Sequence, residues 1–485
     1  MKVRPVFYVL GWLLVGLSLA MFLPGFVALS EGDSENAYVF FSSAVLTTFF
    51  AGGLIISLRG YEARLDKRSS LLLIVLIWTV LPLFAALPIF FSEVTERSGV
   101  AALFEAVSGF TTSGVTLLTN LESQPKAILV WRAVLQWLGG FYTIVAATGI
   151  FVALGIGGMQ LQFTAMPHGE GETLFKRIRQ TGHALLRVYA LLTLLCFVAL
   201  IAAGMTSFDA FCHALSTIST GGFSTRDGSI GAFDNVLIEL IIMIFMILGA
   251  INLALHWAAI NGRWRSYAAD PEVRYFLGCL AVLIILSGAS IWAVGDLRLN
   301  WQTTRDTVFN SVSMLTTTGY WRGDIANLPL VTALMLLAAM LVGGGTGSTT
   351  GGFKQMRLFL LFKQALNELS NLTQPSGVFR LRYAGMTVKP EQSNAIWSVF
   401  VLFAFVLALL TVGLSISGVS FEQSVAMAIS SLTNAGPTAT MFFGDAQAFS
   451  DAPDLTKFIA MAGMITGRME VLTLVTLLNP EFWRG

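Results

Sequence analysis

The stretch Phe104-Glu-Ala-Val-Ser-Gly-Phe-Thr-Thr-Ser-Gly114 has three counterparts further along the chain. They read Phe211-Cys-His-Ala-Leu-Ser-Thr-Ile-Ser-Thr-Gly221, Phe309-Asn-Ser-Val-Ser-Met-Leu-Thr-Thr-Thr-Gly319 and Ala426-Met-Ala-Ile-Ser-Ser-Leu-Thr-Asn-Ala-Gly436. In three of the four, a phenylalanine stands ten residues before the glycine, and small hydroxyl residues crowd the positions just before it. The glycines lie 107, 98 and 117 residues apart. Internal repetition of this kind is a signal of the fold as a whole.

The composition around these segments is that of a polytopic membrane protein. Of the 485 residues, 55% are hydrophobic and only 12% are charged, whereas soluble domains carry about 25% charged residues. The mean hydropathy of +0.74 excludes a soluble enzyme. A net charge of +1 gives no sign of a nucleic-acid partner. Three cysteines and four scattered histidines form neither a disulfide framework nor a metal motif, so we expect no cofactor.

Apolar runs of about 20 residues predict membrane spans. We place ten of them near residues 5–29, 38–58, 70–91, 127–157, 185–205, 234–258, 275–294, 330–353, 393–418 and 456–478. Each glycine segment ends a shorter apolar stretch, near 100–111, 208–219, 305–317 and 422–433, which is too short to cross. The chain therefore divides into two leading helices (1–69) and four repeats of span, short helix, loop and span (70–158, 159–262, 263–389 and 390–485).

The positive charges predict the orientation of these spans. With the N-terminus inside, 20 of the 29 Lys and Arg residues lie on the inner side and eight on the outer side. Both termini are then cytoplasmic, and all four glycine segments lie on the outer side. The remaining cation, Arg468, falls inside the last span.

The repeated unit has the physical properties of an ion pore. Irregular backbone at membrane depth persists only where it is buried in protein or lines a water-filled path. A short helix that ends inside the membrane points its free carbonyls and partial negative charge inward, where they attract a cation. The following Thr/Ser-Gly stretch can turn its carbonyls toward an axis and replace the hydration shell of an ion.

This pattern resembles the Trk/Ktr/HKT superfamily of potassium transporters, most closely the bacterial TrkH-type pore subunits. The resemblance covers the whole chain, including the two leading spans. Local matches are Gln136-Trp-Leu-Gly-Gly140, Gly155-Ile-Gly-Gly-Met-Gln-Leu161, the run from Gly343 to Lys354, and Gly467-Arg-Met-Glu470. It implies an all-α membrane protein of the bacterial inner membrane, with four pseudo-symmetric M1–P-loop–M2 repeats around one K⁺ pathway.

The resemblance also implies which residues form the selectivity filter. By position, its glycines are Gly114, Gly221, Gly319 and Gly436, and plant relatives with serine at the first of these tend to favour Na⁺. The residues that would offer carbonyl groups to K⁺ are Thr112, Ser113, Gly114, Val115, Ser219, Thr220, Gly221, Gly222, Thr317, Thr318, Gly319, Tyr320, Asn434, Ala435, Gly436 and Pro437.

A second glycine-rich run predicts a gate. Six glycines in ten residues will not hold a continuous helix in the eighth span, because each costs about 1 kcal/mol relative to alanine. The order of residues does not fit a nucleotide-binding GxxxxGK[ST] loop, but a kink without a gating role is an alternative. By resemblance, the gate comprises Arg468 and Gly343, Gly344, Gly345, Thr346, Gly347, Ser348, Thr349, Thr350, Gly351 and Gly352. A structural ion pair is the alternative for Arg468.

Other polar residues have structural interpretations. We expect Glu105 to favour the start of its short helix, and Glu239, Asn252 and His256 to hydrogen-bond between helices. Lys126 and Arg132 are expected to snorkel at the outer interface. Trp12, Trp131, Trp257, Trp301 and Trp483 are expected to anchor span ends there or at the inner interface.

The sequence thus predicts K⁺ uptake by channel-like permeation. By resemblance, the chain forms a homodimer and binds a TrkA-like cytosolic ring of nucleotide-binding subunits, for which basic inner segments such as Lys176, Arg177, Arg179 and 354–389 offer docking surfaces. A symporter coupling K⁺ to H⁺ or Na⁺ is the alternative, although it would need a titratable or ion-coordinating residue at the midplane, where the sequence offers few candidates. A membrane enzyme is disfavoured, since paired carboxylates and a Ser/His/Asp set are missing from the span ends.

Overall fold

The computed structural model describes residues 3–60, 66–151, 174–294, 300–374, 377, 380–436, 449–471 and 473. The predicted motif at 155–161, Pro437 and Trp483 lie outside this part of the chain, as do the side chains of Lys176, Arg177 and Arg179.

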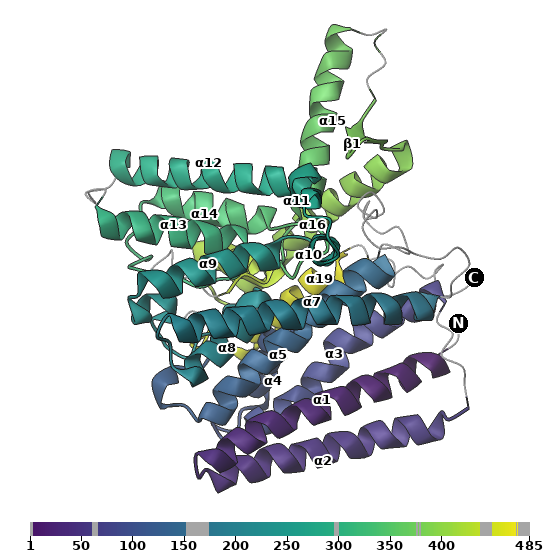
Figure 1. Ribbon diagram of the computed structural model, residues 1–485, viewed down its shortest axis with the longest axis vertical. Helices are drawn as coiled ribbons and strands as arrows, with labels where there is room; N and C mark the ends of the chain where they lie inside the picture. Colours follow the sequence, from purple (N-terminus) through teal and green to yellow (C-terminus); the bar gives the residue numbers. More distant parts are fainter. Residues whose placement is uncertain are drawn as a thin grey trace.

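Most helices run in nearly the same direction across the molecule (Figure 1). The leading pair is α1 (Arg4–Ser30) and α2 (Ser34–Ser57), which pack against each other along their lengths. Asp33 begins α2 by accepting a hydrogen bond from the amide of Asn36 at 3.0 Å, which satisfies one of the free N–H groups of the first turn. Helix α1 also packs on α3 and α5, so the leading pair covers the first repeat.

The four predicted repeats follow in order, each with a short helix between two longer segments. The first repeat holds α3 (Lys67–Phe91), α4 (Gly99–Phe110), the short helix η1 (Leu121–Ser123) and α5 (Lys126–Val145), which continues into the π-helical turn η2 (Ala146–Phe151). The second holds α7 (Leu174–Ala202), α8 (Ser207–Ile218), η4 (Ser229–Phe233), α9 (Val236–Ala250), α10 (Leu253–Ile260) and α11 (Arg265–Ala269). The third holds α12 (Pro271–Val294), α13 (Trp301–Leu315), α14 (Leu330–Val342) and α15 (Gln355–Thr373), and the fourth α16 (Pro390–Ile416), α17 (Phe421–Thr433) and α19 (Asp454–Met469).

All four short helices begin with a side-chain cap. Ser98, Thr206, Asn300 and Ser420 each accept a hydrogen bond from the backbone of the first turn of α4, α8, α13 and α17. Because a cap residue satisfies a donor that has no intrahelical partner, it defines where each short helix starts. The short helices predicted at 100–111, 208–219, 305–317 and 422–433 are confirmed.

Three of the ten predicted spans are not continuous long helices. Within the described chain, seven helices are long and apolar enough to cross a membrane, or eight with the α9–α10 pair, which bends by 99°. The predicted span 234–258 is therefore wrong as a single helix, since α9 ends at Ala250 and Asn252 caps α10. Helix α14 ends at Val342, as the glycine run predicts, and α19 ends at Met469 before Glu470, whose φ is +62°.

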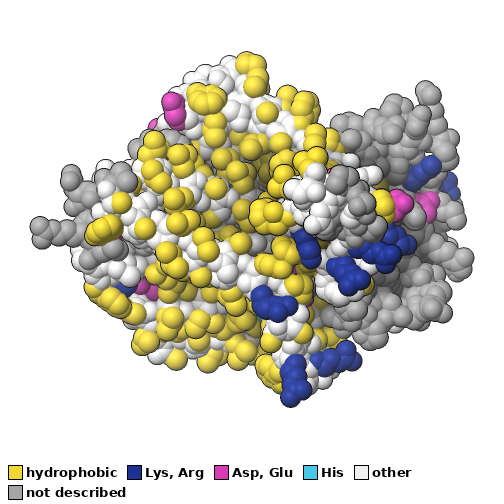
Figure 2. All heavy atoms as spheres, turned by 90° about the horizontal axis from the view of Figure 1, so that it is seen from above, with side chains coloured by type: hydrophobic (Ala, Val, Ile, Leu, Met, Phe, Trp, Pro, Cys, Tyr) yellow, Lys and Arg dark blue, Asp and Glu magenta, His cyan; other side chains and the backbone are white. Residues whose placement is uncertain are grey.

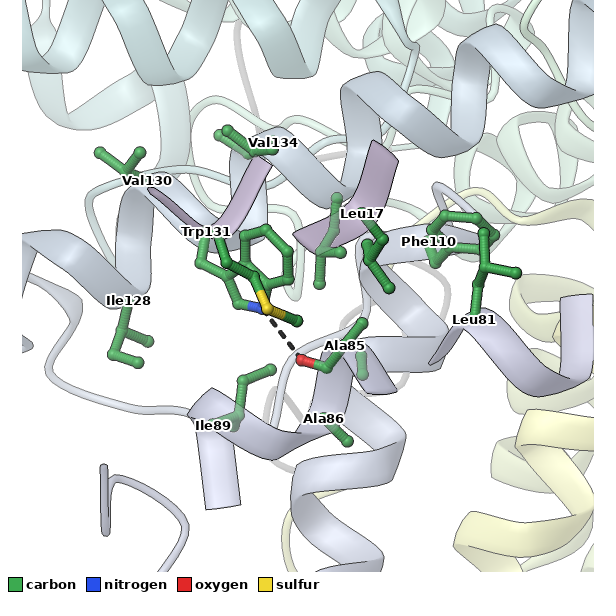
Figure 3. Close-up of a cluster of buried hydrophobic side chains, with 14 of the residues drawn as sticks. Leu17, Leu81, Ala85, Ala86, Ile89, Phe110, Ile128, Val130, Trp131 and Val134 are labelled. Carbon is green, nitrogen blue, oxygen red and sulfur yellow. Dashed lines mark hydrogen bonds between the residues drawn. The ribbon is translucent and has the colours of Figure 1, made fainter. Parts of the chain in front are cut away.

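The leading pair and the first repeat share one apolar core. At its centre, the indole N–H of Trp131 on α5 donates to the carbonyl of Ala85 on α3 at 3.0 Å (Figure 3). Leu17 of α1 and Phe110, the last residue of α4, lie in the same cluster. The prediction that Trp131 anchors an interface is wrong, because its side chain is fully buried. Arg132 is likewise buried rather than snorkelling.

Helix α15 leaves the bundle and stands out from it beside a small hairpin (Figure 1). The hairpin pairs β1 (Arg382–Tyr383) with β2 (Met386–Thr387) in antiparallel register, Arg382 opposite Thr387. Figure 2 shows apolar side chains over most of one face and Lys and Arg side chains gathered toward one end of it. Between α10 and the first turn of α16, the exposed basic residues of the described chain include Arg263, Arg265, Arg274, Arg380, Arg382 and Lys389.

Trp131→Ala tests the core of the first repeat. We expect the variant to lose about 3–5 kcal/mol of stability, the usual cost of truncating a buried tryptophan, because the substitution leaves a cavity and frees the Ala85 carbonyl. Thermal unfolding of the purified protein in detergent measures the effect. Trp12→Ala is the control, since Trp12 is 54% exposed. Equal melting temperatures for the two variants would contradict the assignment.

Candidate ion-conducting site

The four loops after the short helices have the same backbone conformation. Each contains two residues with positive φ, separated by one residue: Thr112 and Gly114, Thr220 and Gly222, Thr317 and Gly319, and Asn434 and Gly436. These φ values lie between +48° and +81°. The first residue of each pair is threonine or asparagine and bears the steric cost of this region, whereas the second is glycine, where a Cβ atom would also meet the backbone of a neighbouring loop. The alternation turns successive peptide groups in a way that a helix or strand cannot.

A second feature confirms this alignment of the loops. The residue before each of these glycines donates its N–H to the carbonyl five residues earlier, namely Ser113 to Ser108, Gly221 to Ser216, Thr318 to Ser313 and Ala435 to Ser430. The acceptor is serine in all four repeats. The hydroxyl groups of Ser108 and Ser430 also donate to the carbonyls of Val115 and Gly436, both at 2.5 Å.

The predicted register of the second loop is therefore wrong by one residue. Gly222, with φ +80°, occupies the position of Gly114, Gly319 and Gly436, and Gly221 occupies that of Ser113. Phe211 corresponds to Phe104 and Phe309 only if Gly221 is taken as the equivalent glycine. It lies eleven residues before Gly222, so the phenylalanine is not a reliable guide to the register of this loop. A serine six residues before the glycine in all four repeats is the sequence signal that was missed.

The loops contact one another in a ring. A Cβ atom on Gly114 would overlap the carbonyl of Gly221, one on Gly222 that of Thr318, and one on Gly319 that of Ala435. The ring closes between the fourth and first loops, where the side-chain amide of Asn434 donates to the Ser113 hydroxyl at 2.7 Å. Of the 16 predicted filter residues, the structure describes all except Pro437 and brings them together in these four loops.

The glycine run Gly343–Gly352 forms a loop between α14 and α15, as predicted. Residues 343–351 are buried, and the glycine run contacts the segments of the second, third and fourth loops. The Thr349 hydroxyl donates to the carbonyls of Ile218 and Gly249, and the Gly351 N–H donates to the Thr317 hydroxyl at 2.8 Å. A Cβ on Gly351 would overlap the carbonyl of Thr433 at the end of α17. Nucleotide binding is incompatible with this buried placement.

Arg468 joins the glycine run to the first loop. Its guanidinium donates to the carbonyl of Thr111 and the hydroxyl of Thr112 in the first loop, and at 2.7 Å to the carbonyl of Thr349 in the glycine run. Arg468 is 4% exposed, so this positive charge is held inside the protein by three oxygen atoms. The alternative of a pair between Arg468 and an acid finds no support, because the nearby Glu470 binds Arg357 instead, at 2.8 Å.

The break in the α9–α10 segment accommodates the glycine run. Gly345 donates its N–H to the Ala250 carbonyl at 2.8 Å, and Leu253 donates to the Gly347 carbonyl at 3.2 Å. These bonds satisfy backbone groups that the bend at Ile251 and Asn252 would otherwise leave open. Glu272 of α12 connects the run to the first turn of α15, because it accepts from the amide of Thr346 in the run and from that of Met356 in α15.

Buried ion pairs brace the loops from behind. Arg132 lies 3.3 Å from the carboxylate of Glu105, with side chains 2% and 0% exposed, and its guanidinium stacks over the ring of Phe223 at 4.0 Å. Glu105 accepts hydrogen bonds from Thr116 and Leu117, which gives it a structural role, but the prediction that it favours the start of its helix is wrong, because α4 begins at Gly99.

Glu239 and His256 are also structural. Glu239 accepts from Arg305 and Arg322, each at 2.7 Å, and so connects the second repeat to the third. His256 contacts the Leu248 carbonyl at 2.9 Å and the Tyr267 hydroxyl. Asn252 differs from its prediction in part, because it accepts from Ala254 as the cap of α10.

The family of the chain follows from comparison with known proteins. The model of the TrkH family, described as a cation transport protein, matches residues 37–483. The chain belongs to the TrkH family. It is 37% identical to the Trk system potassium uptake protein TrkH of Salmonella typhimurium and to that of Escherichia coli K12, with 100% of each chain covered. It is 33% identical to TrkG of E. coli K12, covering 100% of this chain and 99% of the relative.

The fold is also that of a TrkH protein. The crystal structure of the potassium transporter TrkH from Vibrio parahaemolyticus matches with a TM-score of 0.91 and 33% identity over 100% of both chains. The predicted fold class, an all-α membrane protein of four repeats after two leading helices, is confirmed.

Glu105→Gln tests the brace behind the first loop. We expect a loss of about 3–5 kcal/mol of stability, because Arg132 keeps its buried charge without its counter-ion. Thermal unfolding in detergent measures it. Glu93→Gln, which removes one partner of the exposed Arg97–Glu93 pair, is the control and should change nothing measurable. The double variant Glu105→Gln with Arg132→Met should recover most of the loss. A stable single variant would contradict the brace.

Proposed function

We propose that this TrkH-family protein takes up K⁺ by channel-like permeation through the four loops. The observation that carries the proposal is the ring of loops with alternating left-handed residues at Thr112/Gly114, Thr220/Gly222, Thr317/Gly319 and Asn434/Gly436. Backbone carbonyls arranged around an axis can replace the water that an ion sheds, and K⁺ sheds its water more readily than Na⁺. The relatives named potassium uptake proteins support K⁺ as the ion.

The buried acids favour permeation over symport. A symporter coupled to H⁺ or Na⁺ needs a titratable or ion-coordinating group that can exchange its ion, and buried carboxylates are candidates for this role. In the described part of the chain, the buried acids are Glu105, Asp209, Glu239 and Glu272, and each accepts hydrogen bonds from neighbouring side chains or amides. We infer that these carboxylates support the loops and that the membrane potential drives uptake, at about 2.3 kcal/mol per charge per 100 mV.

We infer further that the glycine run and Arg468 form the gate. The run lies against the ends of α8 and α17 and against the third loop, where it would obstruct an ion leaving the filter. The Arg468 charge at the same place would repel K⁺. Movement of Gly343–Gly352 away from the loops would remove both barriers at once.

The proposed partners are a second copy of the chain and a cytosolic nucleotide-binding ring. Helix α15 projects from the bundle with Phe362, Leu366 and Leu369 exposed, which is an apolar stripe suited to a second copy. The exposed basic residues beside α15 and the hairpin suit an acidic cytosolic surface (Figure 2). We also propose that the protein lies in the bacterial inner membrane with both termini in the cytoplasm.

Flux through reconstituted protein tests the function. We expect K⁺-loaded liposomes to take up Rb⁺, with K⁺ as a strong competitor and Na⁺ and Li⁺ as weak ones. Gly319→Ser should lower this discrimination by about tenfold, which corresponds to about 1.4 kcal/mol. The reason is that Gly319 has a φ of +81° and that a side chain there would overlap the Ala435 carbonyl. Gly278→Ser on α12, where a Cβ meets nothing within 4 Å, is the control. Uptake that requires an H⁺ or Na⁺ gradient would favour the symporter.

Arg468→Ala tests the gate. Removal of the three donors that join the first loop to the glycine run should raise basal Rb⁺ flux by at least about tenfold, since charge-assisted hydrogen bonds contribute about 1.5–3 kcal/mol each. The flux assay without any partner protein measures this. Lys457→Ala on the same helix, which removes a cation paired with Asp454, should leave the flux unchanged. Wild-type flux in Arg468→Ala would eliminate the gate proposal.

A further inference from the structure

The second loop differs from the other three in having two consecutive glycines, and one side chain explains the difference. Gln136, on α5 of the first repeat, is fully buried against this loop. Its amide nitrogen donates to the Gly221 carbonyl at 2.7 Å, and its amide oxygen accepts from the Phe223 N–H at 3.2 Å. The carboxamide therefore bridges the two neighbours of Gly222, as a paired strand would.

This bridge requires the first glycine of the loop. A Cβ atom on Gly221 would overlap the carboxamide of Gln136. At the same position the other loops carry Ser113, Thr318 and Ala435, all with side chains. Gly222 is needed for its positive φ, whereas Gly221 is needed because Gln136 occupies the space beside it.

Gln136 has no polar counterpart in the other repeats. It stands three residues before Gly139, which lies against the carbonyl of Phe110 at the end of α4. Gly249 and Gly467 lie in the same way against the carbonyls of Ile218 and Leu432, and Gly343 is the matching glycine at the end of α14. The residues three positions before these glycines are Met246, Met340 and Met464, all fully buried.

The exchange of methionine for glutamine has a direct electrostatic consequence. Methionine fills the same volume with an apolar chain, whereas glutamine places a donor on a loop carbonyl and an acceptor on a loop amide. The bridge fixes the orientation of two peptide groups in the second loop. No described side chain in the other three loops bridges the corresponding carbonyl and amide in this way.

We propose that Gln136 is a positioning residue that sets the geometry of the second filter loop and thereby the preference for K⁺ over Na⁺. The proposal rests on the proposed function of the loops as a filter. A loop held rigidly cannot contract around the smaller Na⁺, so the loss of both hydrogen bonds should lower discrimination without abolishing conduction. Because Gln136 belongs to the first repeat and binds the loop of the second, selectivity also depends on how these two repeats pack against each other.

Gln136→Met is the test, because it keeps the volume and installs the residue that the other repeats use. Reversal potentials in a planar bilayer with K⁺ and Na⁺ on opposite sides give the permeability ratio, and melting in detergent reports folding. We expect a fall of about tenfold in the K⁺/Na⁺ ratio with flux retained. Thr143→Val, which removes a hydroxyl that donates only to the Gly139 carbonyl of its own helix, should keep the wild-type ratio.

A second variant keeps the proposal testable if Gln136→Met does not conduct. Gly221→Ser alone should impair conduction, because its side chain meets the carboxamide, and Gln136→Ala should relieve this clash in the double variant. We expect the double variant to conduct with a lowered K⁺/Na⁺ ratio. A wild-type ratio in either Gln136→Met or the conducting double variant overturns the proposal. A wild-type protein that shows no K⁺ preference would instead overturn the proposed function.

Discussion

Four short helices end inside the protein, and the residues around each end hold the backbone of the loop that follows it. After each end, the chain turns through two left-handed residues and is closed by an N–H donated to the carbonyl of a serine, as from Ser113 to Ser108. Away from water, each peptide group of such a turn needs a partner, since an unsatisfied group costs several kcal/mol. Some partners lie in the same repeat, as Ser108 does for Ser113, and others come from an adjacent repeat, as Gln136 does for Gly221.

The glycines have two different roles, one conformational and one in packing. Gly222 and its equivalents supply a positive φ. Gly139, Gly249 and Gly467 allow the last carbonyl of a short helix to approach a neighbouring span. Gly351 does the same for the glycine run Gly343–Gly352 against the end of α17. Close approach of backbones is the usual basis of helix association in a membrane, where apolar burial gives little driving force. The high glycine content is thus a packing requirement as much as a conformational one.

Among the described residues, Arg468 and Arg132 are buried charges that lie against oxygen atoms or a counter-ion. Arg468 is bound by oxygens of the first loop and of the glycine run, and Arg132 by Glu105 and the Phe223 ring. The guanidinium groups of Arg468 and Arg132 both connect segments that are far apart in sequence. The same interactions that make a buried charge tolerable therefore couple the loops to the helices behind them and to the glycine run.

The sequence by itself determined the membrane class, the four repeats, the capped short helices and the position of the break after Val342. These depend on local properties, namely apolar length, cap residues and the helix cost of glycine, which act within a few residues of where they are read. The tertiary structure shows through φ and the bond to Ser216 that Gly222 rather than Gly221 is the equivalent glycine, although the spacing from that serine already distinguishes the two in the sequence. It also decided that Trp131 and Arg132 face the interior, that Glu470 pairs with Arg357, and that Gln136 meets the second loop. Each of these is a contact between segments that are distant in sequence. The sequence did not predict them because packing sets the direction in which a side chain points across a helix bundle, and sequence spacing does not encode that direction.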